Sequence, residues 1–292
     1  MFRGSFTAVV TPFRNGDIDF AAFEKLVERQ IAAGITGVVA VGTTGESPTL
    51  THDEKHEVIQ RAIKIANGGC KVIAGAGTNS TRDSIEATKF AEKAGADGAL
   101  LVAPYYNKPS QEGLLRHFKA IAGATSLPVM LYNIPGRCAV DIAADTVVRL
   151  AETCRNIVAI KEASGSVERV GELRRRLPNE FTILSGDDSL TLPFMAVGAV
   201  GVVSVASNLF PAELCALVRA CDSGDYKSAE SLHRKLFQVF KDLFIEPNPV
   251  PAKTALAWRG SMSAEVRLPL CEMSDANQTR LRKTVEEFEK AK

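Results

Sequence analysis

Two residues whose types suit carbonyl chemistry stand at the ends of short apolar runs. Lys161 follows the run 157–160, which would carry its ammonium into a desolvated environment. Desolvation disfavours the charged form and lowers the pKa, which leaves an amine able to attack a carbonyl carbon. Tyr132 ends an earlier run, where its phenol would relay protons to and from the adduct. The alternatives are a lysine that is exposed or paired with Glu162, and a tyrosine that only caps a core.

Two further segments indicate binding of small anions. Thr43 and Thr44 stand between two glycines, where backbone N–H groups and hydroxyls can converge on a carboxylate. Arg137 offers a rigid fork suited to bidentate capture of another carboxylate. An ordinary turn and a surface ion pair are the respective alternatives. Each signal is weak alone, but all of them follow strand-like runs, so together they predict one site.

Eight short apolar runs, separated by helix-like amphipathic segments, position these residues. The runs do not alternate in polarity, as expected for parallel strands buried on both faces. Eight strand–helix units predict an α/β fold, a (β/α)8 TIM barrel, with an open doubly wound sheet as the alternative. Catalytic residues of such a barrel lie at the C-terminal ends of its strands. The runs are residues 6–11, 37–41, 72–76, 98–103, 129–132, 158–161, 181–185 and 201–205.

The pattern of the last part of the chain predicts a helical appendage. We expect the barrel to occupy residues 1–224, and a C-terminal helical region packed on it to occupy residues 225–292. Helical patterns cover residues 226–244, 251–258 and 277–290, and the prolines of 245–251 predict a rigid connection between the first two.

Composition and charge exclude several functional classes. The chain is 46% hydrophobic and 24% charged, with a net charge of +1, which is typical of a globular protein and not of a disordered or nucleic-acid-binding one. The uncharged stretch between Asp188 and Glu213 contains Pro193 and two glycines, so it predicts a buried helix, a turn and a strand, and no membrane span. No signal peptide is recognised at the N-terminus, and a cytoplasmic location is expected.

The cysteines and histidines do not form a ligand pattern. The six cysteines are scattered without a C-x-x-C pair, which predicts buried thiols in a reducing cytosol. His52 and His56 lack the glutamate directly after the first histidine that a zincin needs, and Thr51 with Glu54 fits a helix capping box instead. We therefore expect no metal site.

The motifs at the strand ends resemble those of the dihydrodipicolinate synthase family, in the Schiff-base (class I) aldolase and N-acetylneuraminate lyase superfamily. The resemblance extends from Phe2 to the C-terminal helices. Its motifs are Gly42-Thr-Thr-Gly-Glu-Ser47, Ala76-Gly-Thr-Asn-Ser80, Pro104-Tyr-Tyr-Asn-Lys-Pro109, Tyr132-Asn-Ile-Pro-Gly-Arg137, Ile160-Lys-Glu-Ala163 and Ser185-Gly-Asp-Asp188.

The resemblance implies a reaction and its catalytic residues. Lys161 would form an imine with pyruvate, and the derived enamine would attack the aldehyde of L-aspartate-4-semialdehyde. Cyclisation with loss of water would give 4-hydroxy-tetrahydrodipicolinate, in the opening step of diaminopimelate and lysine biosynthesis. Tyr132 would be the central proton donor and acceptor. Thr43 and Tyr106 would complete the relay, with Tyr106 reaching across a dimer interface into the neighbouring site.

It also implies binding residues and an assembly. Thr44, Gly186 and the main chain at Val203 would bind substrate, with Thr44 and Val203 holding pyruvate. Arg137 would hold the carboxylate of the semialdehyde near the entrance of the site. The imine serves as the electron sink, so no metal or other cofactor is implied. A homotetramer built from two tight dimers is expected, with no nucleic-acid or membrane partner.

Relatives that respond to L-lysine bind it at a pocket between the subunits of the tight dimer. Lys55 stands here where a histidine is common, and Asp83 where a longer glutamate holds the amine of the inhibitor. A cation at position 55 would repel an ammonium, so we expect weak or absent inhibition by lysine. The matching positions are Ser47, Pro48, His52, Lys55, Asn79, Asp83 and Tyr105.

Two other functions compete with this interpretation. A sibling enzyme, N-acetylneuraminate lyase or a 2-keto-3-deoxy-sugar-acid aldolase, would share Lys161 and Tyr132. Arg137 disfavours it, because a polyol acceptor needs hydroxyl partners where a short acidic aldehyde needs a guanidinium. A non-catalytic barrel should have lost Lys161 or Tyr132, and this chain keeps both.

Overall fold

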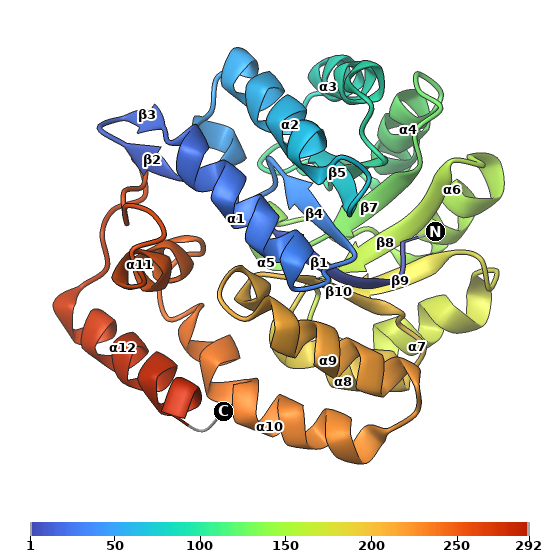
Figure 1. Ribbon diagram of the computed structural model, residues 1–292. Coiled ribbons are helices and arrows are strands. Elements are labelled where there is room, and N and C mark those ends of the chain that lie inside the picture. The colour runs from blue at the N-terminus through green and yellow to red at the C-terminus, as the bar shows by residue number, and fades with distance from the viewer. Residues whose placement is uncertain (1, 291–292) are drawn as a thin grey trace.

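The structure is a computed structural model that describes residues 2–290. Eight parallel strands close into a barrel in the order β1-β10-β9-β8-β7-β6-β5-β4, with helices around it (Figure 1). The predicted (β/α)8 TIM barrel is therefore confirmed and the open sheet is excluded. The barrel strands are Gly4–Ala8 (β1), Gly37–Ala40 (β4), Lys71–Gly75 (β5), Gly98–Val102 (β6), Val129–Asn133 (β7), Ile157–Glu162 (β8), Thr182–Ser185 (β9) and Gly201–Ser204 (β10).

Helices cover the outside of the barrel, and side-chain caps fix where several of them begin. The predicted capping box is confirmed: the Thr51 hydroxyl accepts from the Glu54 N–H, and the Glu54 carboxylate accepts from the Thr51 N–H. Such caps set the length of the loops between strand and helix. The helices of the barrel are Phe20–Ala32 (α1), His52–Ala66 (α2), Thr81–Ala94 (α3), Gln111–Ala122 (α4), Ala144–Thr153 (α6), Val167–Arg176 (α7), Thr191–Ala196 (α8) and Pro211–Asp222 (α9).

Two apolar clusters form the core. One lies between the sheet and the helices and includes the buried Phe23 and Phe118. The other lies inside the barrel, from Phe2, which packs against Gly98, to Tyr132 and Val203. The interior is thus filled with side chains, so chemistry is confined to the ends of the strands and their loops.

A small hairpin before α1 was not predicted. It consists of Phe13–Arg14 (β2) and Asp17–Ile18 (β3), joined by Asn15 and Gly16, both with positive φ. Asn-Gly is the turn signal that would have revealed it, but its strands are too short to show a period. The first barrel strand also begins at Gly4, two residues before the predicted start.

Three more helices follow the barrel: Tyr226–Asp242 (α10), Val250–Trp258 (α11) and Asp275–Lys290 (α12). They lie together beside the barrel, at the orange and red end of the chain (Figure 1). Asp242, at the end of α10, is buried and accepts hydrogen bonds from Arg280 and Thr284 of α12. The division into residues 1–224 and 225–292 stays a prediction.

The uncharged stretch contains α8, a turn and β10, as predicted. Within residues 2–290, no helix combines the length and the apolar character needed to cross a membrane. Five cysteines are buried free thiols, as expected, but Cys271 is exposed. The prediction fails there because Cys271 lies in the irregular segment that leads to α12, where no core covers it.

Candidate active site

The structure brings Lys161 and Tyr132 together at the end of adjacent strands. They are register partners on β8 and β7, and the Lys161 ammonium lies 4.0 Å from the centroid of the Tyr132 ring. Both side chains are buried, and Lys161 is only 5% exposed. Because consecutive strand residues point to opposite sides, Glu162 points away from Lys161. Its carboxylate instead accepts hydrogen bonds from Arg169 and Asn133, so the expected alternative of a Lys161–Glu162 pair is excluded.

Burial makes the Lys161 amine nucleophilic. Desolvation lowers its pKa to about 7, Asp188 opposes this shift, and Arg137 adds to it. Within residues 2–290, the ammonium forms no ion pair and no hydrogen bond. A substantial neutral fraction is therefore present near pH 7, which is the form that attacks a carbonyl.

Asp188 is the carboxylate whose charge acts on Lys161. It is buried, and one of its oxygens accepts from the backbone N–H groups of Val205 and Ala206 at 3.0 and 2.9 Å. Its other oxygen has no partner within residues 2–290. Burial raises the pKa of Asp188 to about 6. The carboxylate thus fixes the segment after Val203 and supplies the negative charge that opposes loss of the Lys161 proton.

The Tyr132 phenol is held in its protonated form. Burial raises its pKa, while Arg137 and the Thr43 side chain oppose the rise. A protonated phenol next to an amine can deliver a proton to a nitrogen or oxygen and take it back as the adduct changes. That Thr43 completes a proton relay with Tyr132 stays a prediction.

The turn of residues 42–47, here named the threonine turn, is closed by its own backbone. The Gly45 and Ser47 N–H groups donate to the Gly42 carbonyl, and the Glu46 N–H donates to that of Thr43. The N–H groups of Thr43 and Thr44 have no acceptor within residues 2–290. Two adjacent N–H groups without an acceptor are available to an anion, and binding of a carboxylate there stays a prediction.

A cavity of about 220 Å³ opens beside this turn. Thr43, Tyr132 and Arg137 line it, and Lys161 lies directly against the Tyr132 ring. Arg137 is carried by the short helix Pro135–Cys138 (α5), which places its guanidinium at the cavity wall. The phenol, the threonine and the arginine therefore lie around one space, with the Lys161 amine next to it.

Gly186 and Val203 lie next to these groups. A methyl group at Gly186 would stand 3.0 Å from Cε and 3.1 Å from Cγ of Lys161, and 2.7 Å from Cβ of Ala163. Val203 packs with Tyr132 in the cluster inside the barrel. Glycine at position 186 is thus required by the close approach of the lysine, whose side chain would otherwise be displaced.

Tyr106 is not brought to this cavity by its own chain. It is 89% exposed, with a positive φ of 73°, whereas its neighbour Tyr105 lines the cavity. Burial raises the pKa of Tyr105. The expectation that Tyr106 enters a neighbouring subunit stays a prediction.

Several positions expected to bind an inhibitor line the same cavity. They are Ser47, Pro48, Lys55 and Tyr105. Lys55 is half-buried, and desolvation lowers its pKa while Asp83 opposes this. His52 is exposed at the start of α2, and the Asn79 carbonyl accepts from the Asn107 side chain.

Sequence reasoning missed Asn248, which belongs to the segment predicted only as a rigid connection. Its side-chain Nδ2 donates to the Thr44 hydroxyl at 2.9 Å, and its backbone carbonyl accepts from Arg137 at 3.4 Å. Its Oδ1 is buried with no partner within residues 2–290. The signal was an amide residue held between two prolines, Pro247 and Pro249.

Lys253 was missed as well. It is fully buried on α11, in the sequence Val-Pro-Ala-Lys-Thr-Ala-Leu-Ala-Trp, where it is the single charge. Its ammonium pairs with Glu46 of the threonine turn at 2.7 Å. A lone charge within an apolar helix was the available signal.

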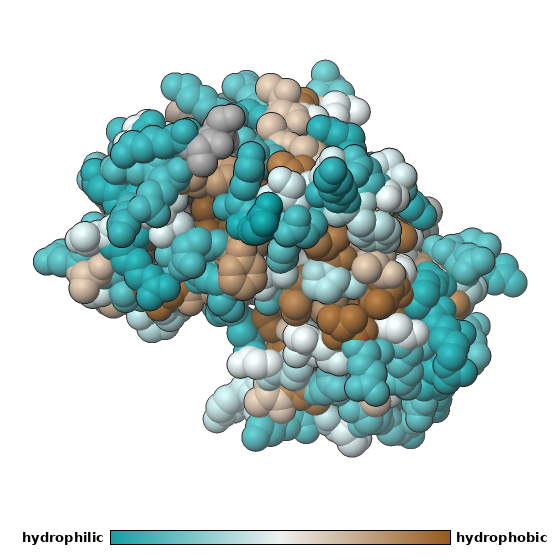
Figure 2. All heavy atoms as spheres, turned by 90° about the horizontal axis from the view of Figure 1, so that it is seen from below, coloured by the Kyte–Doolittle hydropathy of each residue, from teal (hydrophilic) through white to brown (hydrophobic). Residues whose placement is uncertain are grey.

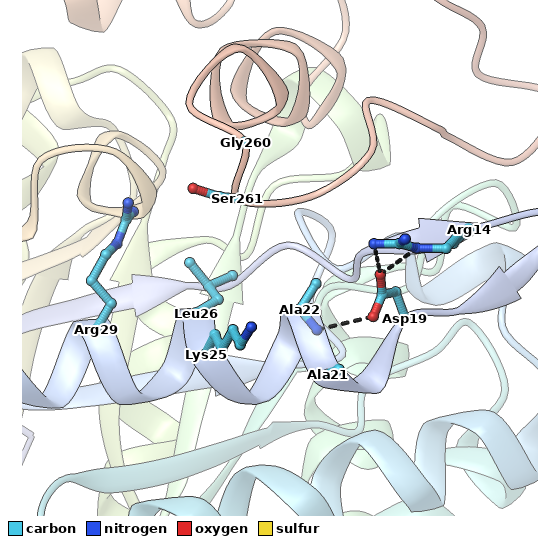
Figure 3. A pocket seen from close by; sticks show the side chains of 9 residues that line it. All are labelled: Arg14, Asp19, Ala21, Ala22, Lys25, Leu26, Arg29, Gly260 and Ser261. Atoms are coloured by element: carbon cyan, nitrogen blue, oxygen red, sulfur yellow. Dashed lines mark hydrogen bonds and ion pairs between the residues drawn. The ribbon is translucent and has the colours of Figure 1, made fainter.

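A second hollow, of about 280 Å³, lies between α1 and the end of α11 (Figure 3). Arg14, Lys25, Arg29 and Ser261 are among the residues that line it. Arg14 is already paired with Asp19 at 2.7 Å. None of the residues expected to act in catalysis lines this hollow. In the part of the chain that the structure describes, no group of three or more His, Cys, Asp or Glu residues is arranged to hold a metal ion.

Comparisons with known proteins agree with this geometry. The model of the dihydrodipicolinate synthetase family matches residues 1–288. The 4-hydroxy-tetrahydrodipicolinate synthase of Aquifex aeolicus is 48% identical over 288 residues, 99% of this chain and 98% of the relative. That of Thermodesulfovibrio yellowstonii is 52% identical over 281 residues, 96% of each chain.

Solved structures give the same result. The 4-hydroxy-tetrahydrodipicolinate synthase of Methylacidiphilum fumariolicum SolV is 56% identical, with a TM-score of 0.98 over 99% of this chain and 97% of that one. A dihydrodipicolinate synthase from Aquifex aeolicus also has a TM-score of 0.98, at 48% identity, over 99% and 98% of the two chains. The chain therefore belongs to the dihydrodipicolinate synthetase family.

Proposed function

We propose that this protein condenses pyruvate with L-aspartate-4-semialdehyde to give 4-hydroxy-tetrahydrodipicolinate, the opening step of diaminopimelate and lysine biosynthesis. One observation carries the mechanism: a buried lysine amine without a charge partner lies 4.0 Å from a buried phenol ring at the ends of adjacent strands. The relatives described above carry the name of this synthase, which favours it over a sibling sugar-acid aldolase.

Lys161 begins the reaction as the nucleophile. Its neutral amine attacks the ketone carbon of pyruvate, and loss of water from the carbinolamine gives an iminium. The iminium withdraws electrons, so the methyl group loses a proton and an enamine forms. The enamine carbon then attacks the aldehyde and makes the new C–C bond. The amino group of the semialdehyde finally displaces Lys161 from the ketone carbon, which closes the ring; one water is released overall.

Tyr132 moves the protons that these steps require. Its protonated phenol donates to the carbinolamine hydroxyl as water leaves, and it supplies a proton to the alkoxide formed at the aldehyde. Thr43 takes part as a hydroxyl that lines the same cavity as the phenol. Tyr106 of a neighbouring subunit completes the relay in this proposal, which agrees with its exposure in the single chain.

Two groups of donors hold the substrate carboxylates. The free N–H groups of Thr43 and Thr44 suit the carboxylate of pyruvate, together with the main chain at Val203 and the space left by Gly186. Asn248 donates to the Thr44 oxygen, so the Thr44 hydroxyl proton is free to turn toward a ligand. Arg137, at the cavity wall, binds the carboxylate of the semialdehyde.

The chemistry requires no metal or other cofactor in this proposal, because the iminium itself is the electron sink. Its energetic basis is the burial of Lys161, which lowers the pKa of the amine to about 7. Attack therefore occurs near neutral pH without a Lewis acid.

The working form is proposed to be a cytoplasmic homotetramer made of two tight dimers. Exposed Tyr106 supports the tight dimer, and apolar patches on the face seen from below support further contacts between subunits (Figure 2). Five buried free thiols fit a reducing compartment. Sedimentation of wild type and of Tyr106→Trp tests the assembly: the variant should dissociate to a smaller species or lose activity.

L-Lysine is proposed to inhibit weakly or not at all. Lys55 is half-buried in the wall of the cavity, where its charge opposes an incoming ammonium, and Asp83 is the carboxylate that acts on it. A lysine titration should give no half-inhibition below about millimolar concentration. A millimolar dissociation constant corresponds to a binding free energy of only about 4 kcal/mol. Half-inhibition well below millimolar would overturn this proposal.

The synthase activity is tested by a coupled assay with pyruvate and L-aspartate-4-semialdehyde, in which dihydrodipicolinate reductase oxidises NADPH. Activity in wild type and none in Lys161→Ala supports the proposal. If pyruvate still labels Lys161 but no product forms, the acceptor is wrong, and sugar aldehydes would then be tested for the sibling aldolase. If pyruvate does not label Lys161, every Schiff-base function is excluded and a non-catalytic barrel remains.

A further inference from the structure

The threonine turn is held from outside by a buried ion pair. Glu46 ends the strained part of the turn with a φ of 54°, in the left-handed region that is uncommon for residues other than glycine. Lys253 donates to its Oε1 at 2.7 Å, and the two side chains are 0% and 1% exposed. The turn that carries Thr43 and Thr44 is therefore attached to α11, about 200 residues later in the chain.

The same ammonium holds a second point of the turn. Lys253 donates to the Thr11 carbonyl at 2.8 Å, and the Thr11 hydroxyl donates to the Gly45 carbonyl at 2.8 Å. Its charge also lies 4.1 Å from the centroid of the Phe13 ring. One buried cation thus fixes the carboxylate of Glu46 and, through Thr11, the backbone carbonyl of Gly45.

Arg267 completes the set of contacts. Its backbone N–H donates to the other oxygen of Glu46 at 3.1 Å, and its guanidinium donates to the Thr49 carbonyl at 3.0 Å. Both carboxylate oxygens of Glu46 are thus occupied by groups that come from beyond the barrel. None of these groups lines the cavity, so they can affect catalysis only through the turn.

A short path connects the ion pair to the proton relay. The Glu46 N–H donates to the Thr43 carbonyl at 3.1 Å, and Thr43 lines the same cavity as Tyr132. A shift of Glu46 would therefore displace Thr43 and the two free N–H groups beside it. Misplacement of catalytic groups by about 1 Å is enough to lower a rate by about 100-fold.

We infer that Lys253 and Glu46 are positioning residues, whose buried ion pair holds the threonine turn in the geometry that the reaction needs. The inference rests on the proposed function. Stability alone does not explain the pair, because the desolvation of two charges offsets most of their attraction and an apolar pair would serve as well. What an apolar pair cannot supply is a set of directed hydrogen bonds to Glu46 and Thr11.

The test is the double variant Lys253→Met/Glu46→Gln, which removes both charges, keeps side chains of similar length and leaves no unpaired ion. The comparison variant is Asp242→Asn, which weakens a buried network between α10 and α12 that does not contact the turn. For each protein, the melting temperature, kcat, the KM for pyruvate and the rate of borohydride trapping of pyruvate are measured.

We expect the melting temperature of the double variant to lie between those of wild type and Asp242→Asn. Its kcat and its trapping rate should be about 10- to 100-fold lower than those of wild type. Rates within twofold of wild type would overturn the inference. The inference would also be overturned if the double variant and Asp242→Asn lost the same melting temperature and the double variant lost no more rate than Asp242→Asn. If wild type traps pyruvate but makes no product from the semialdehyde, the proposed acceptor fails, while the trapping rates still decide the role of the pair.

A second variant keeps the inference testable if the double variant does not fold. Thr11→Val removes only the hydroxyl that donates to Gly45 and changes no charge. We expect kcat to fall a few-fold with an unchanged melting temperature, whereas an unchanged kcat would count against a positioning role for this set of contacts.

Discussion

Two lysines are buried in this molecule in similar surroundings, and they differ in their polar partners. Lys161 is 5% exposed and Lys253 is 0% exposed. Each ammonium lies about 4 Å from an aromatic ring, at 4.0 Å from Tyr132 and 4.1 Å from Phe13. Lys253 has a carboxylate at 2.7 Å, and Lys161 has no ion pair within residues 2–290.

The difference shows how one residue type serves two purposes. Burial lowers the pKa of both amines, but Glu46 opposes the shift at Lys253 through a direct hydrogen bond. Lys253 therefore remains a charged anchor that fixes backbone. At Lys161 only the more distant charge of Asp188 opposes the lowering of the pKa, so its amine can attack a carbonyl.

Removing the amine of Lys161 should have the largest effect on activity. Lys161→Met should lower kcat/KM by at least about 1,000-fold, because no covalent intermediate can form. Its free energy of unfolding should equal or exceed that of wild type, since a buried cation without a charge partner is lost. The coupled assay and urea denaturation measure the two effects. The exposed Lys25→Met is the control and should change neither.

Removing the amine of Lys253 should act on stability first. Lys253→Met leaves the Glu46 carboxylate buried without its cation, which should lower the free energy of unfolding by about 3–5 kcal/mol. Urea denaturation of Lys253→Met and of Lys161→Met provides the direct comparison. A loss below about 1 kcal/mol at Lys253 would show that the two lysines do not differ in the way described here.

Tyr132 tests whether the phenol next to Lys161 is more than a packing partner. Tyr132→Phe keeps the ring but removes the proton donor, so kcat should fall about 100-fold while the fold is retained. Phe13→Leu, beside Lys253, should lower the melting temperature with a much smaller effect on kcat. Equal kinetic effects of the two changes would contradict the assignment.

The pH dependence should follow Lys161. Since its pKa is about 7, the rate of pyruvate trapping should rise about tenfold per pH unit below pH 7 and level off above pH 8. In the unfolded chain this lysine titrates near 10.5, so between pH 7 and 10.5 the unfolded state binds more protons and this group contributes more stability as pH rises. In Lys161→Met, this contribution to the rise of the free energy of unfolding with pH should be absent. A trapping rate independent of pH between 6 and 8 would contradict the account.

Gly186 gives a smaller predicted effect than Lys161 or Tyr132. Gly186→Ala places a methyl group about 3 Å from the Lys161 side chain, which must shift to make room. We expect roughly a tenfold lower trapping rate. Gly171→Ala, on α7 with open space around it, is the matched control and should trap at the wild-type rate. Identical rates for the two variants would mean that the position of Lys161 tolerates the added methyl group.

The fold and the central chemistry were predictable because they depend on local patterns. Lys161, Tyr132 and the threonine turn follow apolar runs, and a closed parallel barrel places the ends of such runs on one side. Lys253 and Asn248 were not predictable in this way, because their partners Glu46 and Thr44 are about 200 residues away in the sequence. Neither periodicity nor turn signals contain information about such a contact.

The measurement that tests the central claim most directly is borohydride reduction of the wild-type protein with pyruvate, followed by peptide mapping. Both lysines are buried, so accessibility alone does not distinguish them. The account predicts one carboxyethyl group per chain, on Lys161, and none on Lys253. Labelling of Lys253, or the absence of any label on Lys161 in the folded protein, would contradict it.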